Sequence, residues 1–430
     1  MTEHKMNETK KEQERVIILS VQVKSGDKFE FTESLSEIVS LCETAGLEVV
    51  ETFVQPRDRA DTKTYLGKGR IEEIVELKDR EDIEFDVVIV NDELTTSQSK
   101  HLAEICGEKV IDRTQLILDI FAQRARSREG QLQVELAQNE YLLPRLAGHG
   151  ISLSRLGGGI GTRGPGETKL ETNRRHIRSR IHDIKGQLDE IKKHRSRYRE
   201  NRKRNQVFQV ALVGYTNAGK SSWFNQLTDS ETYEENLLFA TLDPKSKMLS
   251  INDGFQVLLS DTVGFIQHLP THLVEAFSST LEEAKYADVL IHVVDRSHPN
   301  YKGHIETVNE LLKSLDMADI PVLTLLNKKD LVEKDLIEET FDTRYVSSRH
   351  PDDIKEVKAA LSAFIKSLLV HYELSVSSDD GKTISQLKHE TLVESVDFDE
   401  TNEIYTVNGY ASEDSGLVHR TAEKREKHDE

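Results

Sequence analysis

The stretch Gly214-Tyr-Thr-Asn-Ala-Gly-Lys220-Ser221 fits the pattern G-x-x-x-x-G-K-[ST]. It directly follows the apolar run Val207–Val213, which predicts a buried strand, and it precedes a helical stretch at Ser222–Leu227. Glycines in this context let the backbone wrap a phosphate chain, so that amide N–H groups point inward at a helix N-terminus. We expect Lys220 to neutralise the β- and γ-phosphates and the Ser221 hydroxyl to bind Mg²⁺, which prefers oxygen ligands. The sequence therefore predicts a nucleotide-binding domain around a phosphate loop.

Two further motifs that follow the phosphate loop in the sequence could contact Mg²⁺ and the γ-phosphate. Asp261-Thr-Val-Gly264 ends the strand predicted at Phe255–Ser260, where Asp261 can hold Mg²⁺ through a water and the Gly264 amide can sense the γ-phosphate. Thr241, in Phe239-Ala-Thr-Leu-Asp-Pro244, can offer its hydroxyl to Mg²⁺ and its amide to the γ-phosphate. We therefore expect Lys220, Thr241 and Gly264 to support hydrolysis, with Ser221 and Thr241 as the metal ligands.

A fourth motif, Asn327-Lys-Lys-Asp330, follows the strand predicted at Pro321–Leu326 and concerns the base. A carboxylate at Asp330 can accept the N1–H and a 2-amino hydrogen of guanine, whereas adenine has neither donor. Asn327 would tie this loop to the phosphate loop. Ser347-Ser348 could place a backbone amide near guanine O6, although an ordinary polar loop is an equally good interpretation there. The pattern predicts Mg²⁺-dependent conversion of GTP to GDP.

These segments together supply the predicted nucleotide contacts. They are Gly214, Tyr215, Thr216, Asn217, Ala218, Gly219, Lys220, Ser221, Ser222, Phe239, Ala240, Thr241, Asp261, Thr262, Val263, Gly264, Asn327, Lys328, Asp330, Ser347 and Ser348. The order of the segments along the chain is far more specific than any one of them alone.

Strand and helix patterns alternate on both sides of the phosphate loop, which predicts an α/β fold class with largely parallel sheets. The expected strands are Val16–Val23, Val49–Val50, Phe85–Val90, Lys109–Asp112, Val289–Val294 and Ile404–Tyr410, and the expected helices include Glu33–Ala45, Gly69–Asp79, Thr96–Ile105 and Lys382–Glu390. The predicted organisation is a disordered N-terminus at 1–15, an N-terminal α/β domain with a long helical hairpin at 16–205, a nucleotide domain at 206–369, and a small C-terminal α/β domain at 370–430 with a disordered tail from 422.

The hairpin, at about 113–205, is the strongly basic part of the chain. Helical spacing at 113–143 and 167–204 flanks a segment, 148–166, in which eight of nineteen residues are glycine. Residues 145–204 contain seventeen basic and six acidic side chains, a net charge of +11, although the whole chain carries −19. This separation favours contact with a polyanion such as folded RNA, read through its phosphates and shape. An acidic protein surface, a solvated helix face and a flexible glycine-rich linker are the alternative interpretations.

Composition narrows the class of protein further. The 430 residues include two cysteines, Cys42 and Cys106, which excludes a disulfide scaffold and a multi-cysteine zinc site. No apolar run approaches the roughly 20 residues that span a bilayer, and the polar N-terminus does not resemble a signal peptide. We expect a soluble, cytoplasmic, monomeric protein with no membrane span.

The motifs resemble those of a known family of translation-factor-related GTPases, HflX. The resemblance rests on the four nucleotide motifs and on two further segments, Tyr65-Leu-Gly-Lys-Gly-Arg70 and Gly161-Thr-Arg-Gly-Pro-Gly-Glu-Thr168, and it covers most of 16–369. It implies an N-terminal α/β and hairpin domain, a Ras-like GTPase domain and a variable C-terminal domain. It also implies binding to the 50S large ribosomal subunit and its 23S rRNA, with the tip 148–166 of the arm 145–204 reaching toward the peptidyl-transferase region.

Through this resemblance we expect a protein that splits or rescues stalled or idle 70S ribosomes under heat or stress. A GTP-gated factor that binds or assembles the large subunit without splitting ribosomes is the alternative, and an RNA-remodelling ATPase is a third possibility. Two positions depart from common GTPase patterns: Ser222 stands where many relatives have threonine, and Phe265 stands where many small GTPases have a water-orienting glutamine. Because phenylalanine cannot hydrogen-bond water, we expect slow hydrolysis that the ribosome accelerates.

Overall fold

The computed structural model describes residues 13–80, 82–154, 165–204, 207–229, 238–239, 241–251, 254–266, 278–332, 340–413, 415–419 and 421. The chain forms two compact units, of which the first ends at Leu188 and the second begins at Asp189, within one long helix. Predictions that fall on residues 1–12, 422–430, the segment 155–164 of the predicted tip, and Ala240 lie outside the described residues.

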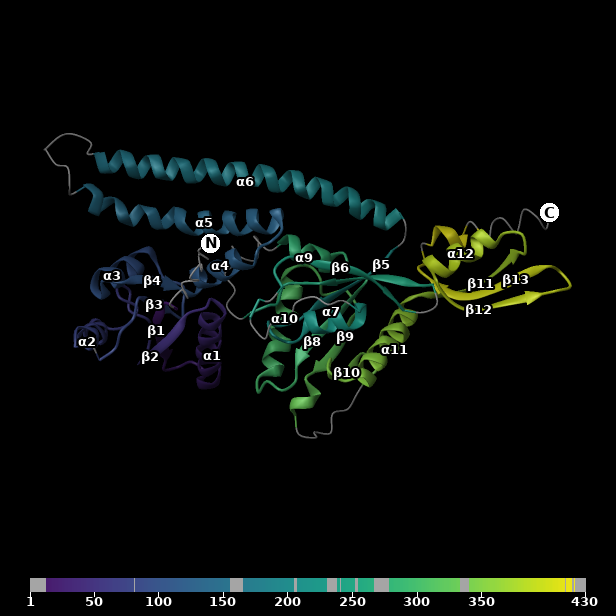
Figure 1. The fold of residues 1–430 in the computed structure, drawn as a ribbon, viewed down its shortest axis with the longest axis horizontal. Coiled ribbons are helices and arrows are strands. Elements are labelled where there is room, and N and C mark those ends of the chain that lie inside the picture. Colours follow the sequence, from purple (N-terminus) through teal and green to yellow (C-terminus); the bar gives the residue numbers. More distant parts are fainter. Residues whose placement is uncertain are drawn as a thin grey trace, which may run out of the picture. The chain divides into compact units, whose positions relative to one another are not determined.

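The first unit contains a four-stranded parallel sheet of order β2-β1-β3-β4 (Figure 1). Its elements are β1 (Arg15–Val23), α1 (Lys28–Thr44), β2 (Glu48–Arg57), α2 (Lys68–Asp79), β3 (Val87–Val90), α3 (Thr96–Cys106), β4 (Lys109–Asp112) and α4 (Arg113–Arg124). Successive side chains of β1 point to opposite faces of the sheet. Ile17 and Leu19 pack with residues of α2 and α3, while Ile18 is buried on the other face. The parallel α/β prediction is confirmed for this unit.

Two long helices extend the first unit: α5 (Arg128–Ser154) and α6 (Pro165–Arg204), the latter continuing into the second unit. The helical prediction for 113–143 is confirmed except at residues 125–127, which separate α4 from α5, and α5 runs eleven residues further than expected, to Ser154. The glycines at 148 and 150 therefore lie within a helix rather than in a loop. Gly186 does not interrupt α6. Ile184 of α6 is fully buried, as are Leu132 and Ala137 of α5.

The second unit is built on a six-stranded sheet of order β10-β9-β8-β5-β7-β6, parallel except for the edge strand β6. The elements are β5 (Phe208–Val213), α7 (Lys220–Thr228), β6 (Lys245–Ser250), β7 (Gln256–Asp261), α9 (Ser278–Lys285), β8 (Val289–Asp295), α10 (Tyr301–Ser314), β9 (Val322–Asn327), η1 (Lys329–Leu331), β10 (Thr343–Tyr345) and α11 (Pro351–Leu368). One face of the sheet packs with residues of α7 and α11, and the other with residues of α9 and α10. This doubly wound arrangement brings the carboxyl ends of β5, β7 and β9 to one edge.

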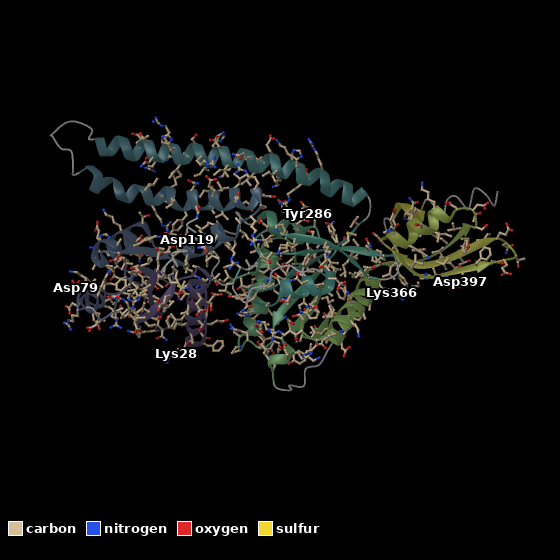
Figure 2. All side chains as sticks on the ribbon, viewed as in Figure 1. Lys28, Asp79, Asp119, Tyr286, Lys366 and Asp397 are labelled. Carbon is tan, nitrogen blue, oxygen red and sulfur yellow. The ribbon has the colours of Figure 1, made fainter. Side chains whose placement is uncertain are left out.

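A three-stranded antiparallel sheet of order β11-β13-β12 completes the second unit. Its elements are β11 (Val370–Ser377), α12 (Gly381–Glu390), β12 (Leu392–Asp399) and β13 (Ile404–Ala411). Leu392 and Tyr410 pack against the core of the nucleotide sheet, and Lys366 of α11, labelled in Figure 2, pairs with Glu394 of β12. The C-terminal piece is therefore anchored on the nucleotide fold.

Within the described part of the chain, no helix combines the length and the apolar character that crossing a bilayer requires. Cys42 and Cys106 are free and buried, and burial raises the pKa of both thiols, to about 12 and about 11 respectively. Both cysteines pack as apolar core residues.

Candidate functional site: a nucleotide cavity and a basic helix

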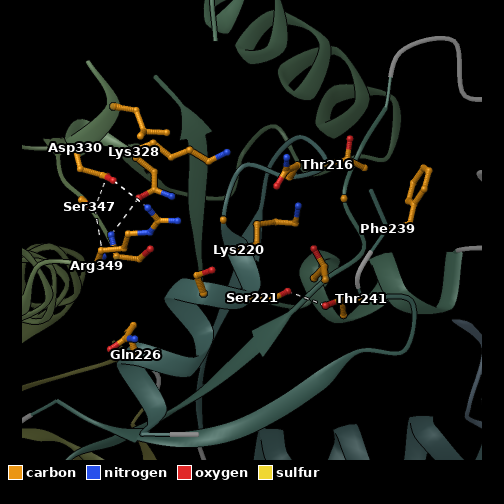
Figure 3. A pocket seen from close by; sticks show the side chains of 18 residues that line it. Thr216, Lys220, Ser221, Gln226, Phe239, Thr241, Lys328, Asp330, Ser347 and Arg349 are labelled. Carbon is orange, nitrogen blue, oxygen red and sulfur yellow. Dashed lines mark hydrogen bonds and ion pairs between the residues drawn. The ribbon is translucent and has the colours of Figure 1, made fainter. Parts of the chain in front are cut away.

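A cavity of about 510 Å³ opens at the carboxyl edge of the second unit's main sheet. Its wall includes Lys220 and Ser221 from the start of α7, Gly264 after β7, and Asp330 after β9 (Figure 3). Segments more than one hundred residues apart in the sequence thus share one lining. A crevice at the carboxyl ends of parallel strands is where doubly wound folds bind ligands.

The phosphate loop turns sharply between β5 and α7, and its last glycine makes the turn possible. Gly219 has a φ of +99°, and a Cβ atom there would lie 2.3 Å from Nδ2 of Asn327. Any other residue would be strained and would collide with this amide. The same Asn327 Nδ2 donates to the Ala218 carbonyl at 2.8 Å, so the base loop is tied to the phosphate loop. That link is the one predicted for Asn327.

Lys220 lies at the centre of the loop and is almost entirely buried. Its Nζ donates to the carbonyl oxygens of Gly214 at 3.1 Å and Tyr215 at 2.8 Å. Burial lowers the pKa of Lys220 to about 8, against the opposing attraction of Asp261. The ammonium is thus mostly protonated at neutral pH and is held at the cavity wall by weak neutral acceptors, which an anionic ligand can replace.

Three oxygen-bearing side chains converge beside Lys220. The Ser221 hydroxyl lies 2.7 Å from that of Thr241 and donates to Asp261 Oδ2 at 2.7 Å, and Thr241 donates to the same oxygen at 2.9 Å. The second carboxylate oxygen of Asp261, Oδ1, is buried without a hydrogen-bond partner, and burial raises the pKa of this carboxyl. A compact, all-oxygen set with an unsatisfied carboxylate fits a hard divalent cation such as Mg²⁺.

The far end of the cavity presents the Asp330 carboxylate. Ser347 Oγ donates to its Oδ1 at 2.6 Å, and Arg349 lies 3.5 Å from its Oδ2 (Figure 3). Burial acts to raise the pKa of Asp330, but the Ser347 hydrogen bond and the Arg349 charge outweigh it and the pKa is lowered. Ser348 N donates to Asn327 Oδ1 at 3.3 Å. The two oxygens of the ionised Asp330 carboxylate can therefore accept hydrogen bonds from N–H groups of a ligand's ring.

The segment after β7 is pinned against the phosphate loop. Phe265 N donates to the Gly214 carbonyl at 3.1 Å, and Thr216 N donates to the Phe265 carbonyl at 2.7 Å. The Phe265 side chain is buried in an apolar cluster with residues of α9 and α10, and it carries no hydrogen-bonding group. It thus packs within the core and cannot orient water.

The structure gathers most of the predicted site residues around this cavity. Those in its lining are Thr216, Asn217, Gly219, Lys220, Ser221, Ser222, Phe239, Thr241, Thr262, Gly264, Asn327, Lys328, Asp330, Ser347 and Ser348. Gly214, Tyr215, Ala218, Asp261 and Val263 are adjacent in sequence but outside the lining. Three lining residues were missed by sequence reasoning: Gln226, Leu331 and Arg349. Arg349 directly follows the serine pair and could have been included on that ground.

Not all basic side chains of the arm 145–204 are free to bind a polyanion, because some pair with acidic groups of the same protein. Arg145 is largely buried: it donates to Asp112 Oδ2 at 3.1 Å and to the Leu94 carbonyl at 2.7 Å, which fixes α5 to the N-terminal sheet. Arg180 forms a two-bond pair with Glu135 of α5 at 2.6 and 2.7 Å. Arg175 and Arg178 are exposed. The side chains able to meet a polyanion are thus a subset of the seventeen counted in the sequence.

Within the second unit, the last part of α6 is linked by charge to α9. Arg195 lies 3.6 Å from Glu282 and 3.5 Å from Glu283, and Lys192 lies 3.6 Å from Glu282. Arg195 and both glutamates are mostly buried, so these pairs are screened less than surface pairs. These ion pairs connect α6 with α9, the first helix described after the Gly264 segment.

Comparison with known proteins matches three family profiles along the chain. They are described as "GTP-binding GTPase N-terminal" at residues 32–122, "GTP-binding GTPase Middle Region" at 124–202 and "50S ribosome-binding GTPase" at 209–328. A solved GTP-binding protein from the archaeon Sulfolobus solfataricus in complex with GDP is 26% identical, with a TM-score of 0.44, and the similarity covers 82% of this chain and 99% of that one.

Two curated relatives are considerably more similar. The GTPase HflX of Alkalihalophilus pseudofirmus is 50% identical over 412 residues, which cover 96% of this chain and 97% of the relative. The GTPase HflX of Escherichia coli is 40% identical over 360 residues, covering 82% and 84% of the two chains. With identity this high over nearly the whole length, and with the cavity geometry described above, the chain belongs to the HflX family of GTPases.

Proposed function

We propose that this GTPase binds GTP and Mg²⁺ in the cavity around Lys220 and uses the nucleotide state to control its contact with the large ribosomal subunit. The observation that carries the proposal is the convergence of Lys220, the Ser221–Thr241–Asp261 oxygens and Asp330 on one cavity of about 510 Å³. The cationic and oxygen-rich end suits a triphosphate, and the carboxylate end suits guanine.

Each part of the cavity has a defined task in this proposal. Lys220 moves from its carbonyl acceptors to the β- and γ-phosphates, and the amides of the phosphate loop donate to phosphate oxygens. Ser221 and Thr241 would supply their hydroxyl oxygens to Mg²⁺ and Asp261 would help to hold it; the ion would supply positive charge for the phosphates. The Gly264 amide responds to the γ-phosphate, so that its loss releases the segment leading to α9.

The basic helical arm is proposed to contact 23S rRNA of the 50S subunit. Its charge of +11 over residues 145–204 supports binding to phosphates. The ion pairs from Arg195 to Glu282 and Glu283 give a physical route from the nucleotide to α6. We propose that the protein acts as a monomer, with domains at 16–205, 206–369 and 370–430.

We propose, more specifically, that the GTP-bound form splits or rescues intact 70S ribosomes and that hydrolysis, stimulated by the ribosome, resets it. Sucrose-gradient profiles of 70S ribosomes incubated with the full chain and a non-hydrolysable GTP analogue test this. Accumulation of free 30S and 50S subunits is the expected result, and Lys220→Ala is the matched control that should leave the 70S peak intact. An unchanged 70S peak, with the protein found only on free 50S subunits, would instead favour a large-subunit binding or assembly factor.

A further inference from the structure

One polar group in the cavity wall has no task in the mechanism above. Thr216 lines the cavity and is 7% exposed, yet its hydroxyl oxygen is buried without a hydrogen-bond partner. A buried hydroxyl without a partner costs free energy, because it gives up its hydrogen bonds to water. Such groups persist where a ligand or solvent molecule completes them.

The backbone around Thr216 is held in place from both sides. Its N–H donates to the Phe265 carbonyl at 2.7 Å, within a parallel bridge between Tyr215 and Phe265. A Cβ atom on Gly264 would lie 2.8 Å from both Cα and Cγ2 of Thr216, and 3.0 Å from Lys220 Nζ. The backbone and methyl group of Thr216 therefore lie close to Gly264 and Lys220 in the cavity lining, and Figure 3 labels Thr216 and Lys220 there.

The other threonine hydroxyls of the lining are already engaged. Thr241 donates to Asp261 Oδ2 at 2.9 Å, and Thr262 donates to the Leu212 carbonyl at 2.6 Å. Phe265, which follows Gly264, is buried among apolar side chains and carries no hydrogen-bonding group. Among the threonines that the structure describes in this lining, the uncommitted hydroxyl is thus that of Thr216.

We propose that the Thr216 hydroxyl positions the water that attacks the γ-phosphate of GTP, a task that Phe265 cannot perform. A hydroxyl has one donor hydrogen and two acceptor lone pairs, so Thr216 can donate to a γ-phosphate oxygen while accepting from the water. The water oxygen forms the new bond to the γ-phosphorus, and the bond from that phosphorus to the β–γ bridging oxygen breaks. The electron pair stays on the β-phosphate of GDP, and the water's proton passes to a phosphate oxygen.

This inference rests on the proposed GTP site and is tested on the full-length protein with Mg²⁺-GTP. Thr216→Val keeps the shape but removes the hydroxyl, whereas Thr216→Ser keeps the hydroxyl but removes the methyl group. Single-turnover hydrolysis should fall by about 10- to 100-fold in the valine variant, the range for losing a hydrogen bond to a charged group, and stay within about threefold of the original rate in the serine variant. Affinity for GDP, which has no γ-phosphate, should remain within about threefold in both.

Three results would overturn the role of Thr216: hydrolysis by the valine variant at the original rate, a serine variant as impaired as the valine variant, or GDP affinity that falls in step with hydrolysis. The last two would mean that Thr216 only supports the shape of the loop. Failure of the unmodified protein to bind GDP or GTP would count against the GTP site itself, and it is measured separately by the same titrations.

Discussion

Replacing Asp330 with asparagine should change which base the cavity prefers. Ser347 Oγ donates to Asp330 Oδ1 at 2.6 Å, so in the variant the amide oxygen should keep this position and the NH₂ group should replace Oδ2. Guanine would then meet a donor where it needs an acceptor. Xanthine, which carries a carbonyl at position 2, would meet a suitable partner.

The size of the effect follows from the hydrogen bonds involved. Each bond from a guanine N–H to an ionised carboxylate contributes roughly 1.5–3 kcal/mol. Asp330 is partly exposed, with its side chain 19% accessible, so we take the lower end for two such bonds, about 3 kcal/mol. At about 1.4 kcal/mol per tenfold change, GDP affinity should fall by roughly 100-fold.

Competition of GDP and XDP against a fluorescent guanine nucleotide measures this change directly. Ser347→Ala is the matched control. It removes the hydroxyl that orients Asp330, so it should weaken GDP binding by about tenfold without favouring XDP. An Asp330→Asn protein that retains the original GDP-to-XDP preference would refute the assignment of Asp330 as the base reader.

Three further changes probe other parts of the molecule. Lys220→Ala removes the positive charge at the phosphates and should weaken the binding of GTP and GDP by at least about 100-fold in equilibrium titrations. Burial, aided by the Lys220 charge, lowers the pKa of His292 to about 4 from 6.5, so the unfolded state binds the extra proton and stability should fall as pH drops from 6.5 toward 4. By pH 5 this amounts to about 2 kcal/mol, and the unfolding midpoint of His292→Gln should depend less on pH. Arg175→Glu combined with Arg178→Glu should weaken binding to large ribosomal subunits by at least about tenfold and flatten its salt dependence, while sparing GDP affinity.

The controls for these changes come from the same chain. Lys382→Glu with Lys388→Glu alters two exposed charges on α12 by the same amount, and should leave subunit binding unchanged. Equal losses in the arm and α12 variants would indicate a general charge effect. Near-normal GTP affinity after Lys220→Ala would contradict the assignment of the phosphate site. If the unfolding midpoints of His292→Gln and the original protein depend equally on pH, the acid-sensitive group is not His292.

The fold of the nucleotide domain was predictable because most of its motifs directly follow predicted strands. Gly214–Ser221, Asp261 and Asn327 each follow a largely apolar run, and a parallel sheet brings the ends of such runs to one edge. Arg349 was not predicted, although it directly follows Ser347-Ser348, because a single arginine in a polar loop belongs to no strand-linked pattern. The tie between Asn327 and Ala218 was foreseen as a link between loops, but its 2.8 Å bond could be placed only by the structure.

Elements with weak periodicity were harder to foresee. The edge strand β6 has a single buried residue, Leu249, so its sequence shows no apolar run. The helix α5 continues to Ser154 through glycines that local propensity would place in a loop. Arg145 was counted as part of an RNA-binding surface, and its pairing with Asp112 depends on a contact 33 residues away that no local pattern encodes.

The proposal that the ribosome controls this GTPase is tested most directly by GTP turnover of the full-length protein, measured with and without purified large ribosomal subunits. Phe265 stands at the position after Gly264 where many small GTPases have a water-orienting glutamine, so turnover should be slow alone and should rise at least about tenfold when subunits are added. The variant with Arg175 and Arg178 changed to glutamate should stay near the slow rate. Equal turnover with and without subunits would mean that hydrolysis is not coupled to the ribosome.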